Sequence, residues 1–110
     1  MAIDPTTPIV YAGIQVTVTG TPQCLYDLLA AVEPHIGAGQ TVLLQADPGN
    51  EALVILVGDS QVSTTRYGFA MGAGESRNYP PSGFQSVPIS NIWVMCSTDA
   101  SALLNCEVIA

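Results

Sequence analysis

The chain consists of short apolar segments separated by glycine, proline and polar turns. In residues 52–76, an unbroken apolar run over 52–57 ends in the G-D-S turn at 58–60. A second apolar segment over 67–71 then meets the G-A-G turn at 72–74. Strand-like runs that alternate with such turns are typical of an antiparallel β-domain. Because the 52–57 run lacks polar alternation, we expect a central strand buried on both faces.

The same pattern extends along most of the chain and predicts about eight short strands. In the first, residues 9–19, Ile14, Val16 and Val18 alternate with polar residues, which indicates one buried and one solvated face. The other expected strands and extended segments are 40–46, 52–57, 66–71, 76–79, 84–89, 92–96 and 103–109. Short strands with regularly spaced turns predict an all-β sandwich or barrel.

One segment, residues 22–32, has a helical pattern. Thr21 is suited to cap its start, and Pro22 to occupy the first helical position. Its apolar residues are spaced to form one stripe: Leu25, Leu28, Leu29 and Val32. The helix should end at Glu33, because a residue before proline avoids helical geometry. A helix this short is marginal alone, so we expect it to pack against the sheets.

A length of 110 residues indicates one domain. Residues 1–8 hold two prolines, two threonines and an aspartate, and this predicts an extended arm without a core role. The β-sandwich domain is then expected over 9–110.

Charge restricts the classes of function. Only 10% of the residues are charged, against about 25% in typical domains. Lysine is absent, Arg66 and Arg77 are the only cations, and the net charge is -7. Binding to nucleic acid or to an anionic membrane surface needs cations, so both are disfavoured. The weak charge has two interpretations: a surface covered by another protein, or a neutral surface rich in Ser, Thr, Gln and Asn.

The longest apolar run, 52–57, falls far short of the roughly 20 residues of a membrane span. The N-terminus lacks the basic start and apolar stretch of a secretory signal, so we expect a protein made and assembled inside a cell. Cys24, Cys96 and Cys106 form no metal-type pair and are expected to be buried. A disulfide between Cys96 and Cys106 is an alternative, on the condition that the two residues lie on neighbouring strands.

No residue pattern predicts catalysis, a cofactor or a metal. His35 is the single histidine, and no G-x-S-x-G motif marks a nucleophile. Asp47 and Glu51 flank a P-G-N turn and read as a solvated acidic rim rather than a calcium loop. The G-x-G sequences at 37–39 and 72–74 precede strands and not helices, so they are interpreted as turns.

Aromatic and cationic residues mix in one stretch of the chain. They are Arg66, Tyr67, Phe69, Arg77 and Tyr79. Because aromatic residues and arginine are enriched in protein interfaces, these residues form the candidate partner interface. In the alternative interpretation Phe69 belongs to the core and the arginines are solvated.

Three motifs follow one another in this region: V-I-L-V-G-D-S-Q-V-S over 54–63, G-F-A-M over 68–71 and G-A-G-E-S over 72–76. A later I-S-N-I-W-V over 89–94 precedes a closing strand. With these motifs the chain from Val16 onward resembles the small head decoration (cement) proteins of tailed bacteriophages. Those proteins show a strand ending in V-G-D/N-S, a strand reaching G-F-x-L and an x-x-G-E-S turn. Related sequences also occur in phage tail and fibre-base components.

The resemblance implies a jelly-roll-like antiparallel β-sandwich without catalysis. It also implies a virion protein, made in the bacterial host cytoplasm, that binds the outer capsid surface at junctions of the major capsid protein, often as a homotrimer. The chain departs from the family layout in the loop 79–83 and in the arm, which are the expected sites of chain-specific contacts. Ile3, Asp4 and Pro5 therefore join the candidate interface. An extended arm can add to a neighbour's sheet edge.

Two other classes of function stay open. One is a carbohydrate- or host-binding β-sandwich of a phage tail or fibre base, in which Tyr67, Tyr79 and Trp93 would form an aromatic platform. The apolar run around Trp93 argues instead for its burial in the core. The other is a small enzyme with a cupin-like metal site, for which one histidine supplies too few ligands.

Overall fold

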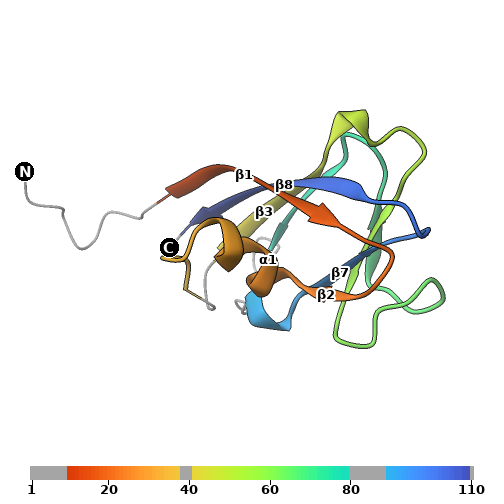
Figure 1. Cartoon of the computed structure of the whole chain (residues 1–110), viewed down its shortest axis with the longest axis horizontal. Coiled ribbons are helices and arrows are strands. Elements are labelled where there is room, and N and C mark those ends of the chain that lie inside the picture. Colours follow the sequence, from red (N-terminus) through yellow and green to blue (C-terminus); the bar gives the residue numbers. More distant parts are fainter. Residues whose placement is uncertain (1–9, 38–40, 80–88, 110) are drawn as a thin grey trace, which may run out of the picture.

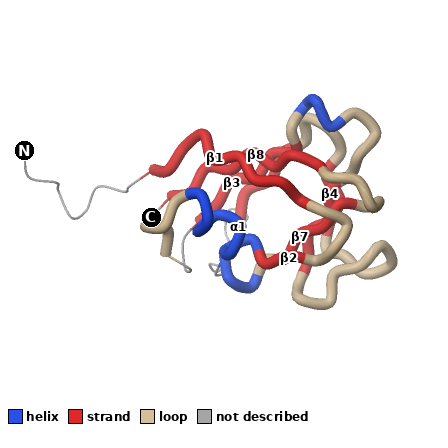
Figure 2. The backbone as a smooth tube through the Cα atoms, viewed as in Figure 1, coloured by secondary structure: helices blue, strands red, loops and turns tan. Residues whose placement is uncertain are grey.

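The computed structural model describes residues 10–37, 41–79 and 89–109. Strands dominate it (Figure 2). The strands are β1 (Val10–Val18), β2 (Gln23–Cys24), β3 (Thr41–Ala46), β4 (Ile55–Gly58), β5 (Phe69–Met71), β6 (Ser76–Tyr79), β7 (Trp93–Cys96) and β8 (Ala102–Ile109). The helices are α1 (Leu25–Val32) and two short 3-10 helices, η1 (Pro48–Asn50) and η2 (Ile89–Asn91).

The strands form two antiparallel sheets of four strands each (Figure 1). Sheet A has the order β1-β8-β3-β6 and sheet B the order β2-β7-β4-β5. β1 pairs with β8, β2 with β7, β3 with β6 and β4 with β5, so the first half of the chain pairs with the second half in reverse order. This is the strand order of a jelly roll, in which a long hairpin is rolled into a two-sheet sandwich. The predicted jelly-roll-like sandwich is therefore confirmed.

The core lies between the sheets and follows the period-two alternation of the strands. Ile14, Val16 and Val18 of β1 point inward, as their spacing predicts. The other core residues come from both sheets, from the helix and from the segments beside it: Val42, Leu44, Ala46, Ala102, Leu104, Cys106, Val108, Ile55, Val57, Met71, Val94, Cys96, Leu25, Leu29, Ile36, Ile89 and Ile92. The helix packs against β1 and η2. Burial of these side chains is the main stabilising contribution to the sandwich.

The helix begins later than the pattern predicts. Residues 23–24 form the short strand β2, and the residue at the helix N-cap is Cys24, with an extended ψ of 126° and no capping side chain. Gln23 holds the preceding turn, because its side-chain oxygen accepts a hydrogen bond from the Thr19 amide at 3.1 Å. Pairing with β7 thus overrides the proline start signal. The predicted end at Glu33 is confirmed, but Val32, at the end of the apolar stripe, is 54% exposed.

Two strands are shorter than predicted. β4 starts at Ile55, because the Leu53 amide donates to the Asn50 carbonyl at 3.0 Å and holds residues 50–53 in a turn. β5 starts at Phe69, because Ser63 and Arg66 form an isolated bridge that places the preceding residues in a loop. The predicted segment 84–89 lies outside the described residues except for Ile89. The described residues nevertheless form eight strands, because β2 was not predicted.

The three cysteines are free and buried, as expected. Cys96 lies on β7 in sheet B, whereas Cys106 lies on β8 in sheet A. The two strands follow one another along the chain, but the jelly-roll order puts them in different sheets. The condition for a Cys96–Cys106 disulfide, neighbouring strands, is therefore not met.

Asn50 secures the corner through which the chain passes from β3 in sheet A to β4 in sheet B. It is buried, and its side-chain amide donates to the Leu103 carbonyl while its side-chain oxygen accepts from the Leu103 amide, both at 2.9 Å. A side chain here takes the place of a neighbouring strand at the start of β8. The sequence shows Asn50 only as part of a turn, because its partner lies 53 residues away.

Candidate interaction surfaces

The connection between β4 and β5, residues 59–68, folds back over the outer face of sheet B. We call it the cover loop. Its Val62 amide donates to the Asp59 carbonyl at 2.9 Å, and the Gly68 amide donates to the Val57 carbonyl at 2.7 Å. Beneath it lies a second apolar cluster formed by Leu56, Val62 and Met95, with Val54 and Trp93 packed against it. The outer face of sheet B is therefore buried by the protein's own chain.

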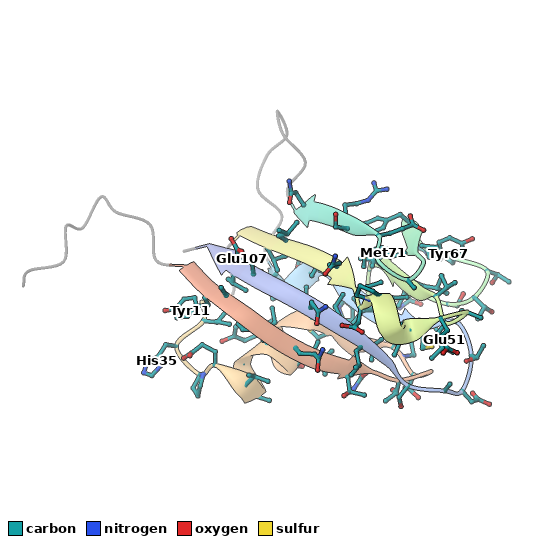
Figure 3. All side chains as sticks on the ribbon, turned by 90° about the horizontal axis from the view of Figure 1, so that it is seen from above. Tyr11, His35, Glu51, Tyr67, Met71 and Glu107 are labelled. Carbon is teal, nitrogen blue, oxygen red and sulfur yellow. The ribbon has the colours of Figure 1, made fainter. Side chains whose placement is uncertain are left out.

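Arg66 and Tyr67, two residues of the predicted partner interface, lie on this cover loop. Tyr67 is 49% exposed and lies at the opposite end of the molecule from His35 (Figure 3). The Arg66 guanidinium bonds the Asp59 carboxylate at 3.2 Å, with both side chains largely exposed. The prediction that Arg66 and Tyr67 belong to a strand is wrong, but both side chains are exposed to solvent.

A pocket of about 240 Å³ opens beside these residues. It is lined by Gly58, Asp59, Arg66, Tyr67 and Gly68. The pKa of the Asp59 carboxyl is lowered, first by a hydrogen bond from the Gln61 backbone amide and then by Arg66. Asp59 thus stays ionised at neutral pH and offsets the charge of Arg66.

Phe69 and Arg77 lie on β5 and β6, the edge strands of the two sheets. Phe69 is paired with the buried Val57 and Arg77 with the buried Leu44, so both start from the core-facing side of their sheets, where Phe69 is half-buried and Arg77 is exposed at the edge. The guanidinium carbon of Arg77 is 4.1 Å from the centre of the Phe69 ring, within the range of a cation–π contact. The two side chains therefore close an edge of the sandwich, and Phe69 packs against the core cluster.

The rest of the predicted interface is not brought together in the described structure. Tyr79 ends β6 opposite Val42, and its side chain lies outside the described part of the molecule. Ile3, Asp4 and Pro5 also lie outside the described residues. Of the predicted interface, Arg66 and Tyr67 are the solvent-facing pair that shares one pocket.

Trp93 is half-buried and belongs to the cluster under the cover loop. The apolar run predicts that Trp93 lies in the main core, whereas the structure places it on the outer face of sheet B. Because Trp93 packs against this cluster whereas Tyr67 is exposed, the structure gives Trp93 a packing role.

Sheet A carries a feature that the sequence did not reveal. Gln15, Asn105 and Gln45 occupy registered positions on β1, β8 and β3, all on the outer face. Gln15 donates to Asn105 at 3.0 Å, and Asn105 donates to Gln45 at 3.5 Å and to Asp47 at 3.0 Å. We call these three side chains the amide row. Because the strands are far apart in sequence, only their pairing brings the amides into line.

A hollow of about 440 Å³ lies over the amide row. Gly13, Leu43 and Glu107 line it together with the row. Figure 3 shows Glu107 on the strands of sheet A, well separated from Tyr67 on the cover loop. The hollow and the small pocket are therefore two distinct surface features.

The described residues offer no reactive constellation. Burial raises the pKa of the Cys106 thiol to about 12, so the nucleophilic thiolate does not form at neutral pH. The exposed His35 has its Nδ1 2.9 Å from Glu33, whose pKa is lowered by this contact. Within 10–37, 41–79 and 89–109, no three His, Cys, Asp or Glu side chains gather to hold a metal ion.

Comparisons with protein-family models, with curated proteins and with solved structures each found no match to this chain. Among the described residues, no helix combines the length and apolar character needed to cross a membrane. A jelly roll alone does not specify a function.

Proposed function

We propose that this protein is a structural subunit of a bacteriophage virion, a decoration (cement) subunit that binds the outer capsid surface and stabilises contacts between major capsid proteins. The observation that carries the proposal is where the three motifs fall in the fold. V-G-D-S ends β4 and begins the following turn, G-F-A-M comprises Gly68 and β5 itself, and G-A-G-E-S forms the turn that leads into β6. The motifs behind the resemblance thus fall on consecutive strands and turns of a jelly roll, the architecture that the resemblance implies.

The turn before β6 has the chemistry that its motif requires. Gly74 has a φ of +81°, a conformation that glycine adopts without strain. The Glu75 side chain accepts a hydrogen bond from the Gly72 amide at 3.0 Å, and the Glu75 amide donates to the Gly72 carbonyl at 3.0 Å. Glycine and glutamate in G-A-G-E-S are therefore structural, which supports a shared fold rather than a shared active site.

Arg66 and Tyr67 are our candidates for the contact with the major capsid protein. An exposed aromatic ring beside an exposed arginine is the composition of interface hot spots. The exposed Arg66–Asp59 ion pair contributes little to stability, so exchanging Asp59 for a partner's carboxylate has a low energetic cost. We further propose that the protein is a homotrimer made in the bacterial cytoplasm. We propose no nucleic-acid or membrane partner, because an acidic chain without lysine disfavours binding to either.

Sedimentation with capsids assembled without this protein tests the proposal. The full-length protein should pellet with such capsids, and light scattering after gel filtration should give a trimer. A double variant, Arg66→Glu with Tyr67→Ala, should reduce the pelleted fraction at least tenfold. Glu51→Ala, another exposed loop position, is the matched control and should pellet as the wild type does.

Each part of the proposal has its own contrary result. A wild-type protein that stays in the supernatant with intact capsids would reject the decoration role. Normal pelleting of the double variant would reject the cover loop as the contact surface but leave the role in place. A monomer that still pellets would reject only the trimer.

A further inference from the structure

The amide row has hydrogen-bonding capacity that the fold does not use. Within the described residues, the side-chain oxygen of Gln15 and the side-chain amide of Gln45 have no partner. Glu107 makes no side-chain hydrogen bond or ion pair with the described residues, although it lines the hollow. The row therefore leaves one acceptor, one donor group and one carboxylate facing the same space.

A β-bulge keeps this space open. The register of β1 against β8 shifts between Tyr11 and Ile14, and Gly13 within the shift has a φ of +73°. A Cβ atom built on Gly13 would meet no other atom within 4 Å, so the glycine is required by its backbone conformation and not by crowding. Since Gly13 has no side chain, β1 leaves the space beside Glu107 unfilled.

The residue types on this face are not those that strand formation favours. Asparagine is depleted in strands, yet Asn105 lies on β8, an interior strand of sheet A. A β-branched residue at its position would suit an outward face better. A local choice that opposes intrinsic preference is expected at functional sites.

The chemistry of the hollow restricts what it can bind. Amides both donate and accept hydrogen bonds, Glu107 accepts, and Leu43, 36% exposed, adds an apolar contact. No cation lines the hollow, and the chain carries a net charge of -7, so an anionic ligand would be repelled. Hydroxyl groups that donate and accept, next to apolar C–H faces, match this set. The volume of about 440 Å³ lies within the roughly 300–1,000 Å³ of small-molecule sites.

We propose that the hollow over the amide row binds a neutral saccharide through Gln15, Asn105, Gln45 and Glu107. This inference does not depend on capsid binding, because the hollow and the cover loop are separate parts of the surface. On a virion it would add a weak host- or glycan-binding function to the proposed structural role.

Nuclear magnetic resonance titration of the full-length ¹⁵N-labelled protein tests the inference. The probes are maltose, cellobiose and lactose as neutral disaccharides, and sialyllactose as an anionic counterpart of lactose. At least one neutral sugar should shift the side-chain amide signals of Gln15, Gln45 and Asn105 saturably, at millimolar concentration. Sialyllactose should bind more weakly than lactose, because its carboxylate meets the acidic surface.

Variants locate the binding. Gln15→Ala with Gln45→Ala should weaken saccharide binding at least tenfold. Both side chains lie on the outer face of sheet A, Gln15 exposed and Gln45 half-buried, so their loss leaves the core between the sheets intact. Thr17→Ala is the matched control: Thr17 is exposed on β1 opposite Leu103, outside the hollow, and its replacement should leave the affinity unchanged.

Several results would overturn the inference. Absence of saturable shifts with all three neutral sugars rejects it, and binding that survives the double replacement rejects this location. Stronger binding of sialyllactose rejects the assignment to neutral ligands. If no sugar binds and the double variant changes the oligomeric state, the hollow is instead a contact between copies of the chain.

Discussion

Leu56 and Leu43 hold comparable positions in the two sheets. Each lies on an interior strand, β4 of sheet B or β3 of sheet A, and each points away from the main core. Leu56 is nevertheless only 3% exposed, whereas Leu43 is 36% exposed. The difference arises because the cover loop inserts Val62 over sheet B, while no comparable described segment covers the outer face of sheet A.

The outer faces of the two sheets thus differ in how far they are buried. The outer face of sheet B is a satellite core, of the kind found under long loops. The outer face of sheet A is polar and presents amides in register. Apolar burial is therefore concentrated between the sheets and under the cover loop, whereas the outer face of sheet A has no cover among the described residues.

Alanine substitutions of the two leucines should differ most strongly in their effect on stability. Leu56→Ala should destabilise the protein by about 2–5 kcal/mol, because it removes a buried side chain and leaves a cavity. Leu43→Ala should lose about 1 kcal/mol or less, because much of its side chain already contacts water. Urea unfolding followed by Trp93 fluorescence measures both. Equal losses would show that the two faces are not differently covered.

A smaller loss is expected at the corner between the sheets. Asn50→Ala should lose roughly 1–3 kcal/mol, because the Leu103 amide is left without its acceptor. The Leu103 carbonyl keeps a second bond, from the Asp47 amide at 3.0 Å. The same urea titration measures this loss, and an Asn50→Ala variant as stable as the wild type would contradict the role of Asn50 at the corner.

Val62 tests the cover loop itself. Val62→Ala removes two methyl groups from the satellite core and should lose about 1–2 kcal/mol. Val32→Ala is the matched control, since Val32 is 54% exposed at the end of α1 and alanine favours helix. The midpoints of urea unfolding of the two variants are compared, and that of Val62→Ala should be the lower. Similar midpoints would mean that the loop contributes no burial to sheet B.

The ionisation of Asp59 in the cover loop should affect stability least. The pKa of Asp59 in the folded protein lies below the ordinary 3.8. The ionised carboxylate therefore adds to the free energy of unfolding at pH values above its unfolded-state pKa. This addition is lost as the pH falls through the folded-state pKa. Because the Gln61 amide is the main cause, Arg66→Gln should raise this pKa only in part. Carboxyl ¹³C titration measures it, with Glu33 as an unaffected control. Return of Asp59 to 3.8 in Arg66→Gln would make the ion pair the main cause.

Several parts of the candidate surfaces could be predicted from the sequence. Arg66 and Tyr67 stand out by composition, and both are exposed on one loop. The cation–π pairing of Phe69 with Arg77 could not be predicted, because it joins edge strands of different sheets. The amide row was missed for the same reason: each glutamine or asparagine reads as an ordinary solvated position until its strand is paired.

The sequence alone was sufficient to predict the class of fold, since period-two alternation and the glycine, proline and aspartate turns are local signals. It also determined that Ile14, Val16 and Val18 face the core and that the helix ends at Glu33. Which strands are neighbours depends on the folded chain. The same holds for the replacement of the first turn of the predicted helix by β2 and for the placement of Cys96 and Cys106 in different sheets. Jelly-roll pairing joins residues up to 99 positions apart, such as Val10 and Ile109, and no local pattern encodes such contacts.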